Sequence, residues 1–180
     1  MQRSAALVLA ATAAATYVYA DHAATADAWR SFTLETPYLA VHMPGTPTKS
    51  VRNDQSFVGD IATDEYRVKD GIDGYSVEVT ELPGFALLFA GPDTVYDHTK
   101  GALLKATLSK VISFTDVTLD GTNGKRLVYD TPTKPGHPEM QGEARMFLSG
   151  DWLYVADTVV EMEGGDSKQD RFFSSLKIKP

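Results

Sequence analysis

Paired carboxylates are the residues of this sequence whose types and spacing come closest to a catalytic arrangement. Asp64 and Glu65 are adjacent, and Glu161 is separated from Glu163 by one residue. Two carboxyl groups on the same face of a strand can act as general acid and base, and the spacing of Glu161 and Glu163 would allow this. Acidic residues at strand ends more often serve as solvated charges. We therefore assign no catalytic role to either pair.

The sequence carries no recognised nucleophile or phosphate-binding motif. It has no cysteine, which excludes a thiol nucleophile, and it has no Gly-x-Ser-x-Gly elbow. Gly121 and Gly124 fall in a predicted hairpin turn, and Gly164-Gly165 is not followed by lysine, so neither fits a phosphate-cradling loop. A serine hydrolase assembled from scattered Ser, His and Asp residues stays open as a third class of function. We predict that the chain is not an enzyme and binds no cofactor.

Potential metal ligands lack the spacing of a metal site. The four histidines are His22, His42, His98 and His137, and no two have the short separation of a zinc ligand pair. The turn Asp120–Gly124 lacks the alternating acids and the distal glutamate of a calcium loop. We therefore predict that the chain holds no metal.

An apolar segment between two proline–glycine pairs is the strongest indication of a binding site. Residues 82–92 read LPGFALLFAGP. Such a segment commonly forms a buried turn of helix or a connection that packs across the edge of a sheet. If it is exposed, Phe85, Leu87, Leu88 and Phe89 would bind a partner protein or line the mouth of an apolar pocket. These four are the candidate partner- or ligand-binding residues.

The elements that would position these residues are mainly β-strands, because apolar and polar residues alternate along most of the chain from Phe32 onward. In YSVEVT, residues 75–80, the apolar side chains share one face and the polar side chains the other. Residues 152–156, WLYVA, are apolar at odd and even positions alike, which predicts a central strand covered on both faces. The predicted strands are Phe32–Glu35, Leu39–Met43, Ser56–Lys69, Tyr75–Thr80, Ile112–Leu119, Lys125–Asp130, Gln141–Leu148 and Trp152–Ala156.

Three glycine-containing turns join these strands into antiparallel hairpins. The turns DGIDG, DGTNG and SGD supply Gly, Asp and Asn where a tight turn needs positive φ angles. We therefore predict a largely antiparallel sheet. The predicted hairpins pair residues 56–69 with 72–81, 112–119 with 125–130, and 141–148 with 152–161.

A first helix is predicted at residues 93–110. Its leucines and Val111 follow one helical stripe, and Pro92 precedes Asp93 and Thr94, either of which would serve as the N-cap. Gly101 weakens the middle of this helix, because glycine costs about 1 kcal/mol relative to alanine there.

A second helix is predicted at residues 166–174, with Asp166 or Ser167 as its N-cap. A helix this short is not stable in isolation and must dock on another element. The adjacent rings of Phe172 and Phe173 provide the apolar surface for that docking. We therefore expect both phenylalanines to close the hydrophobic core instead of forming an exposed hook.

The first twenty residues, MQRSAALVLAATAAATYVYA, predict a secretory signal peptide. A single positive charge at Arg3 precedes an uncharged alanine-rich run, and Val18-Tyr19-Ala20 fits a small-x-small cleavage site. The run is too short and too weakly apolar for a membrane-spanning helix. We assign residues 1–20 to the signal peptide, with cleavage extending to residue 28 as the alternative, and residues 29–180 to a single domain. The expected location is periplasmic or secreted.

Charge and composition exclude several classes of partner. The chain has a net charge of −7, which becomes −8 when Arg3 is removed with the signal peptide. An acidic chain without a basic cluster repels phosphate backbones, so we predict no nucleic-acid binding. Without cysteine, no N-terminal lipid anchor can form. The expected partner is another envelope or secreted protein, and a small apolar ligand held between sheet and helix is the alternative.

The order of these elements resembles the PsbP-like family, which is named for an extrinsic subunit of photosystem II. The matching residues are Phe32-Thr33-Leu34, Leu39–Met43 before Pro44, Tyr75-Ser76-Val77, the helix near 93–110, Gly121–Arg126, Gly142 with Arg145–Leu148, and Phe172–Leu176. The resemblance covers residues 32–178. It implies an α+β fold in which a central antiparallel β-sheet is flanked by helices, as an α/β/α sandwich.

The matched positions are structural, so the resemblance assigns no catalytic or metal-binding residue. Family members serve as assembly or accessory factors. The resemblance therefore implies an exported, non-enzymatic accessory or protein-binding domain whose process is unknown. Many bacterial members carry a lipid-modified cysteine, which this chain lacks.

Overall fold

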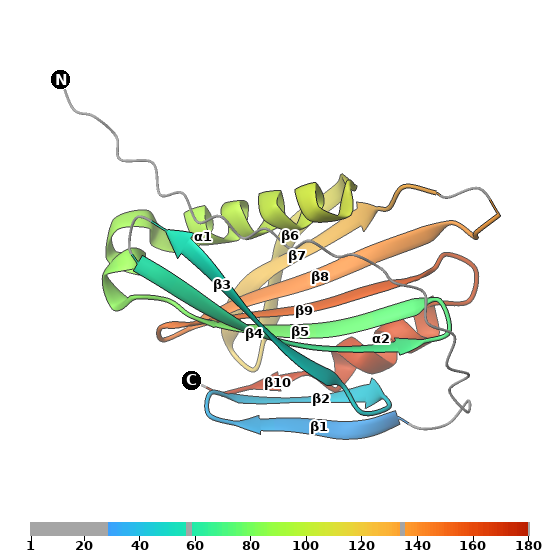
Figure 1. Ribbon diagram of the computed structural model, residues 1–180, viewed down its shortest axis with the longest axis horizontal. Coiled ribbons are helices and arrows are strands. Elements are labelled where there is room, and N and C mark those ends of the chain that lie inside the picture. Colours follow the sequence, from blue (N-terminus) through green and yellow to red (C-terminus); the bar gives the residue numbers. More distant parts are fainter. Residues whose placement is uncertain (1–28, 57–58, 134–135, 180) are drawn as a thin grey trace.

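The computed structural model describes residues 29–56, 59–133 and 136–179. Of residues 54–56, 59–60, 85–86 and 88–90 it describes the backbone but not the side chains. The predicted signal peptide also lies outside the described residues. Figure 1 shows strongly twisted strands with one helix on either side of the larger sheet. In chain order the elements are β1 (Trp29–Glu35), β2 (Tyr38–Pro44), β3 (Thr48–Ser56), β4 (Gly59–Asp70), β5 (Asp73–Glu81), α1 (Gly84–Thr107), β6 (Lys110–Leu119), β7 (Thr122–Asp130), β8 (Met140–Ser149), β9 (Trp152–Glu161), α2 (Asp166–Ser174) and β10 (Lys177–Ile178).

The larger sheet has seven strands in the order β3-β4-β5-β9-β8-β7-β6, and every neighbouring pair is antiparallel. All three predicted hairpins are confirmed as β4–β5, β6–β7 and β8–β9. Strand β9 is the central strand of the sheet. The side chains of residues 153–156 point alternately to the two faces of the sheet, and all four are buried. The prediction of a central strand covered on both sides is therefore confirmed.

Strand β3 was not predicted, and the predicted strand Ser56–Lys69 was wrong at its start. Ser56 ends β3, and β4 begins at Gly59. The sequence of β3, TKSVRNDQS, contains Val51 as its single apolar residue, so it gives no alternation signal. An edge strand needs pairing on one side only, and such strands often carry charged residues, as β3 does.

A second, three-stranded sheet covers part of one face of the larger sheet. Its order is β1-β2-β10, and β10 pairs with β2 although the two are far apart in sequence. Leu39, Val41 and Met43 of β2 are buried in the core between the two sheets. The predicted α/β/α sandwich is thus confirmed only in part. One face of the larger sheet was expected to carry a helix alone, but it carries both α2 and the small sheet.

Helix α1 begins at Gly84, well before the predicted start at residue 93, and ends at Thr107. It consists of two helical pieces joined at Gly91, whose φ of 71° and ψ of 161° are not helical. Pro92 follows directly, where the absent N–H costs nothing at the start of the second piece. The prediction that Asp93 or Thr94 caps the helix was wrong, since Gly91 holds the non-helical position.

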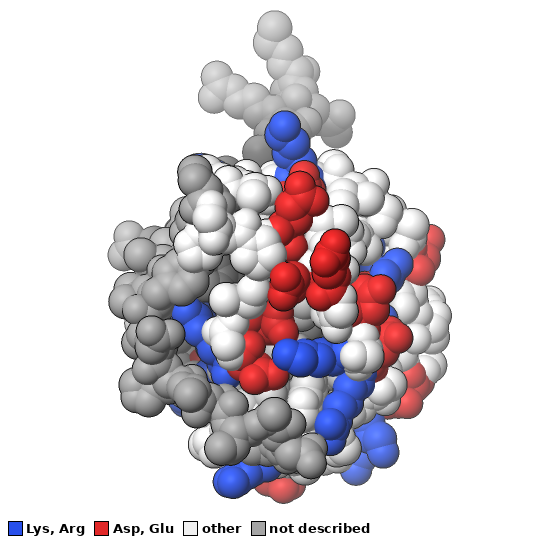
Figure 2. All heavy atoms as spheres, turned by 90° about the vertical axis from the view of Figure 1, so that its right-hand side faces the viewer, with Lys and Arg blue, Asp and Glu red and all other residues white. Residues whose placement is uncertain are grey.

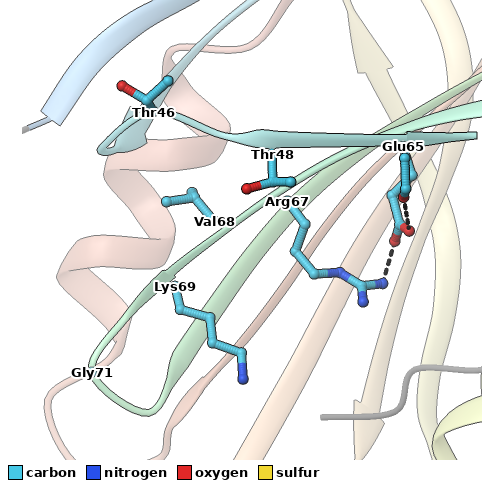
Figure 3. A pocket seen from close by; sticks show the side chains of 8 residues that line it. Thr46, Thr48, Glu65, Arg67, Val68, Lys69 and Gly71 are labelled. Carbon is cyan, nitrogen blue, oxygen red and sulfur yellow. Dashed lines mark hydrogen bonds and ion pairs between the residues drawn. The ribbon is translucent and has the colours of Figure 1, made fainter. Parts of the chain in front are cut away.

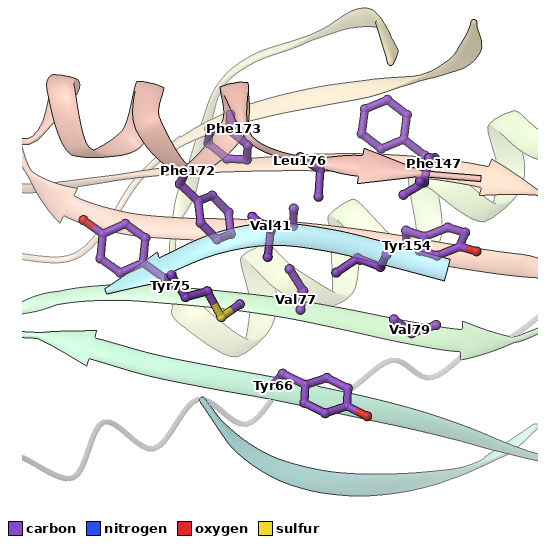
Figure 4. Packing of buried hydrophobic residues seen from close by; sticks show 14 of the residues in the cluster. Val41, Tyr66, Tyr75, Val77, Val79, Phe147, Tyr154, Phe172, Phe173 and Leu176 are labelled. Atoms are coloured by element: carbon purple, nitrogen blue, oxygen red, sulfur yellow. The ribbon is translucent and has the colours of Figure 1, made fainter. Parts of the chain in front are cut away.

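Helix α2 closes the core as predicted. Phe172 and Phe173 are 0% and 2% exposed, and their ring centroids lie 5.1 Å apart in an edge-to-face arrangement. Figure 4 shows both rings and Leu176 directed toward the strands, close to Tyr75 and Val41. The predicted cap was wrong, because Gly165 occupies the N-cap position and no side chain caps the helix.

The seven-stranded sheet separates two hydrophobic cores. The first core lies under α2 and the small sheet, and includes Val77, Tyr154 and Phe172. The second core lies under α1, where Tyr96 and Leu103 of the helix pack with Leu127 of β7 and with residues of β8 and β9. In the described ranges, no helix is long and apolar enough to cross a membrane.

Candidate functional site

A polar region occupies β3, β4 and β5 on the same face of the sheet that carries α1 over β7 to β9. Residues of one parity along a strand share a face, so the strand register arranges these side chains in rows. The rows combine hydroxyl groups with charges of both signs. We call this region the polar face; its rows are Thr48, Arg67, Ser76 and Asp157, then Ser50, Glu65 and Glu78, then Arg52, Thr63 and Thr80.

Charged side chains of the polar face pair with one another. Arg67 Nη2 forms an ion pair with Glu65 Oε1, while Glu65 Oε2 accepts a hydrogen bond of 3.1 Å from Ser50 Oγ. Arg52 Nη2 lies 3.3 Å from Glu78 Oε2. Burial nevertheless raises the pKa of Glu78, because desolvation outweighs the attraction of the Arg52 charge. The polar face is therefore an ordered set of ion pairs and not a loosely solvated surface.

A groove of about 590 Å³ opens at one end of the polar face, where the chain enters β3 and where β4 turns into β5. Arg67 and Lys69 are two residues apart on β4, and Figure 3 shows both side chains extending in the same direction from that strand. The groove thus offers hydroxyl groups, two cations and one carboxylate to a bound molecule. Its lining residues are Thr46, Thr48, Ser50, Glu65, Arg67, Val68, Lys69 and Gly71.

Asp157 lies where the polar face meets the second core. Tyr129 Oη donates a hydrogen bond of 2.8 Å to Asp157 Oδ1. Burial is the main cause that raises the pKa of Asp157 to about 8; Glu78 and Glu65 add to the rise, and the Tyr129 hydrogen bond and Arg67 oppose it. At neutral pH this carboxyl group is therefore largely protonated. A second cavity of about 20 Å³, large enough for one water, is lined by Arg67, Lys69, Gly74, Tyr75, Ser76 and Asp157.

The position of Tyr129 depends on Gly142. The two residues are register partners on β7 and β8. A Cβ atom added at Gly142 would lie 2.0 Å from Cζ of the Tyr129 ring, so the phenol lies directly over the glycine. This close approach directs the hydroxyl group of Tyr129 toward Asp157.

The binding residues predicted from sequence lie in the first turns of α1. Leu87 is half-buried and packs against the second core. The side chains of Phe85, Leu88 and Phe89 lie outside the described residues. That these four residues form a partner- or ligand-binding site therefore stays a prediction.

The carboxylate pairs singled out in the sequence lie in different surroundings. Asp64 and Glu65 project to opposite faces of β4, where Asp64 Oδ2 lies 2.7 Å from Lys49 Nζ and Glu65 pairs with Arg67. Glu161 ends β9, and Glu163 is exposed in the turn that follows. Figure 2 shows acidic side chains gathered on the end of the molecule that faces the viewer.

Histidines of the described chain lie on separate elements, with His42 on β2, His98 on α1 and His137 in the loop before β8. His22 lies outside the described residues. Within residues 29–56, 59–133 and 136–179, no group of three His, Cys, Asp or Glu residues could hold a metal ion.

An exposed apolar cluster forms the other notable surface. Leu108, Val111 and Ile112 are 78%, 52% and 55% exposed. Leu108 follows the end of α1 with a left-handed φ of 54°, and the other two begin β6, an edge strand of the larger sheet. We call these three residues the edge cluster. A register shift between Val111 and Ser113 places a bulge at Ile112, which directs this side chain away from the regular ladder.

Comparison with solved structures identifies the fold. The chain matches the solution structure of cyanobacterial PsbP (CyanoP) from Synechocystis sp. PCC 6803 over 89% of its own length and 98% of that chain, with a TM-score of 0.57 and 15% sequence identity. The fold is PsbP-like. A crystal structure from Bacteroides thetaiotaomicron matches with a TM-score of 0.50 and 8% identity, over 86% of this chain and 50% of that chain. No protein-family model and no curated protein matches the sequence.

The PsbP-like resemblance inferred from the sequence is thus confirmed for the fold. The polar face was not inferred, although charged and apolar residues alternate along part of β4. Glu65, Arg67 and Lys69 are separated by Tyr66 and Val68. That alternation could have indicated one polar side for this strand. Its pairing with β3 could not have been inferred, because β3 itself was not predicted.

Proposed function

We propose that this chain is an exported, non-enzymatic accessory domain that binds another envelope or secreted protein. The predicted signal peptide at residues 1–20 supports export. The PsbP-like fold agrees with the resemblance inferred from the sequence, and that resemblance implies an accessory role.

The edge cluster is the observation that carries protein binding. Large apolar side chains that are more than half exposed and close together mark interaction surfaces on many proteins. Leu108, Val111 and Ile112 lie within five consecutive residues, next to the outer edge of β6. A partner that covers this cluster would remove apolar surface from water beside backbone N–H and C=O groups at the sheet edge.

The opposite edge of the sheet provides the matched comparison. Val51 on β3 is also 55% exposed, but it stands alone between Lys49 and Arg52, which both form ion pairs. Charged residues of this kind protect an edge strand against association. The sheet therefore has one charged edge and one apolar edge, and we assign the partner to the apolar edge.

Site-specific photo-crosslinking tests this assignment. A benzophenone amino acid placed at Ile112 in the native host should form a discrete adduct with one exported protein after irradiation. The same residue placed at Val51, with equal exposure, should form no such adduct. Adding Val111→Asp to the Ile112 probe should lower the adduct yield at least five-fold without lowering the melting temperature.

The proposal would be overturned if Val51 gave the same adduct as Ile112, or if the captured protein were cytoplasmic. An adduct only from probes in residues 82–92 would move the interface to the segment predicted from the sequence. The apolar-ligand alternative stays a prediction; native mass spectrometry of the purified chain for bound lipid would test it.

A further inference from the structure

We propose that the partner binds by strand addition, in which an extended, acidic segment of the partner protein pairs with the outer edge of β6 and continues the larger sheet. This inference rests on the protein-binding role proposed above, and it names the kind of segment that the apolar edge takes. The apolar side chains of the segment cover the edge cluster, and its acidic side chains contact the lysines beside that cluster.

The outer edge of β6 is open to a further strand. β6 ends the order of the seven-stranded sheet, and β7 is the one described strand that pairs with it. Figure 1 shows β6 beside α1. All ten residues of β6 are exposed or half-buried, whereas most residues of the central strand β9 are buried. The backbone N–H and C=O groups of such an edge are available for pairing with an extended segment.

The sequence of β6 favours pairing along most of its length. Beyond the bulge at Ile112, residues 113–119 form an uninterrupted ladder with β7. These residues read SFTDVTL, which is rich in the aromatic and β-branched side chains that suit a strand. The segment contains no Pro, Gly or Lys, whereas β3 at the opposite edge carries Lys49 and Arg52. β6 therefore lacks the residues that commonly prevent strand addition.

The hairpin turn identifies the backbone groups of β6 that face outward. Residues 120 and 121, with φ angles of 49° and 84°, form a two-residue turn between the register partners Leu119 and Thr122. Such a turn makes its flanking residues a hydrogen-bonded pair, and hydrogen-bonded pairs alternate along an antiparallel ladder. Every second residue of 113–119 therefore directs its N–H and C=O groups away from β7. The outward-directed residues are Phe114, Asp116 and Thr118.

Two exposed lysines next to the edge cluster determine the charge of the segment. Lys105 lies in the last turn of α1, three residues before Leu108, and Lys110 begins β6 next to Val111. Both lysines are exposed, and neither forms an ion pair with a described residue. Asp130 is the register partner of Lys110, but the two side chains do not form an ion pair.

These charges favour an acidic segment over a basic one. The chain has a net charge of −7, so two positive charges beside an apolar cluster are a local exception. Acidic side chains on the partner are attracted to the lysines, and basic side chains are repelled. A second copy of this chain would bring the same two lysines and the same net negative charge. The charge of the edge therefore favours a different protein as the partner.

The test is a titration of the ¹⁵N-labelled chain at pH 7 with a short synthetic peptide of alternating valine and threonine that carries two glutamates at one end. We expect saturable shifts of the β6 amides. Hydrogen exchange at the outward-directed amides of Phe114, Asp116 and Thr118 should slow at least five-fold in the complex. A peptide with lysines in place of the glutamates should bind at least five-fold more weakly.

A proline substitution tests the backbone pairing itself. Thr118→Pro removes an N–H group that faces solvent in the free chain, a position where an edge strand tolerates proline. It should weaken binding of the acidic peptide at least five-fold. Thr118→Val is the matched control, because it also removes the hydroxyl group that contacts Asn123 but keeps the N–H group, so the affinity should not change.

A lysine substitution tests the charge. Lys110→Gln should weaken binding of the acidic peptide at least three-fold. The same substitution at the opposite edge, Lys49→Gln on β3, should leave the affinity unchanged. Amide spectra that match the wild type outside β6 and β7 establish that each variant is folded. If Thr118→Pro does not fold, Lys110→Gln and the lysine peptide still decide the outcome.

The proposal is overturned if the acidic peptide gives no saturable shifts, if the lysine peptide binds as tightly, or if Thr118→Val weakens binding as much as Thr118→Pro does. Protection of the same three amides in the free chain as its concentration rises would assign the edge to a second copy, which also overturns the proposal. The crosslink from Ile112 reports separately on the protein-binding role. An adduct without peptide binding rejects strand addition alone, and peptide binding without an adduct rejects the exported partner.

Discussion

On the face of the larger sheet that carries α1, strands β7 to β9 and strands β3 to β5 present opposite kinds of surface. The first half is apolar, and its residues form the second core with Val95, Tyr96 and Leu103 of α1. The second half is the polar face, where ion pairs and hydroxyl groups take the place of apolar contacts. A single sheet face thus changes from a dry interior to a polar surface within the width of a few strands.

The difference indicates how stability and binding are divided in this molecule. Burial of apolar area supplies most of the free energy that stabilises a fold, whereas partly exposed ion pairs contribute about 1 kcal/mol or less. The apolar half can therefore stabilise the sheet while the polar half remains available for a ligand. The Tyr129–Asp157 hydrogen bond joins the two halves, since Tyr129 belongs to the second core and Asp157 lines the small cavity of the polar face.

Truncating the apolar half should have the largest effect on stability. Leu127 is completely buried in the second core. Leu127→Ala removes packed methyl groups and leaves a cavity, so we expect the free energy of unfolding to fall by about 2–5 kcal/mol. Urea denaturation measures this loss. A loss below about 1 kcal/mol would contradict the assignment of stability to the apolar half.

Disturbing the contact between Gly142 and the Tyr129 ring should have the next largest effect on stability. Gly142→Ala places a methyl group against the Tyr129 ring, which must move away from Asp157. Overpacking of this kind costs about 1–3 kcal/mol, to which loss of the hydrogen bond adds about 1 kcal/mol. Gly101→Ala on α1 is the control: a Cβ atom there meets nothing within 4 Å, so this variant should be as stable as the wild type or more so. Equal melting temperatures for the two variants would show that the glycine does not set the ring position.

Much of this division could not be predicted from the sequence. Alternation and turn residues predicted the hairpins, the central strand and the burial of Phe172 and Phe173, because these depend on local pattern. The small sheet depends on β10 pairing with β2 across most of the chain, which local pattern cannot indicate. The kink at Gly91 was missed because the segment 82–92 and the helix predicted from residue 93 were interpreted as separate elements.

The groove and the buried acid were missed for a similar reason. Asp157 occurs in the strand sequence WLYVADTVV as an ordinary polar residue among apolar ones. Its environment is set by Gly142 and Glu78 of the neighbouring strands β8 and β5, and by Tyr129 and Arg67 of the next strands, β7 and β4. Strand register fixes these neighbours, and register follows from the complete sheet. By contrast, the apolar segment 82–92 was visible in the sequence because its signal is contained in consecutive residues.

Within the polar face, the threonine pair of the third row tests whether hydrogen bonds replace packing there. Thr63 and Thr80 are both buried, and their Oγ1 atoms lie 2.8 Å apart. Thr63→Val removes the partner of a buried hydroxyl group, so we expect a loss of about 1–3 kcal/mol in the free energy of unfolding. The double variant Thr63→Val, Thr80→Val should lose less than Thr63→Val alone, because no hydroxyl group is left without its partner. Additive losses from the two single variants would show that the pair does not act as a unit.

Asp157 lies at the boundary between the two halves, and the pH dependence of the free energy of unfolding tests whether it is buried there. An aspartate in an unfolded chain has a pKa of about 3.9, whereas burial raises that of Asp157 to about 8 in the folded protein. Between these values the folded state holds a proton that the unfolded state has lost, so the free energy of unfolding should fall as pH rises, by at most ~1.4 kcal/mol per unit. From pH 6 to pH 7.5 we expect this group to account for a loss of about 1–2 kcal/mol.

The variant Asp157→Asn isolates this contribution, because the amide keeps an oxygen that accepts from Tyr129 but does not titrate. Its stability should depend less on pH than that of the wild type, and the advantage of the variant should grow from pH 6 to pH 7.5. Glu78, whose pKa burial also raises, faces the same region and should leave a residual slope of the same sign. Asp116→Asn is the control, because this side chain is 87% exposed beside Lys125. If Asp157→Asn and Asp116→Asn followed the same pH profile, Asp157 would be ionised and solvated, and the apolar half would end before it reaches β9.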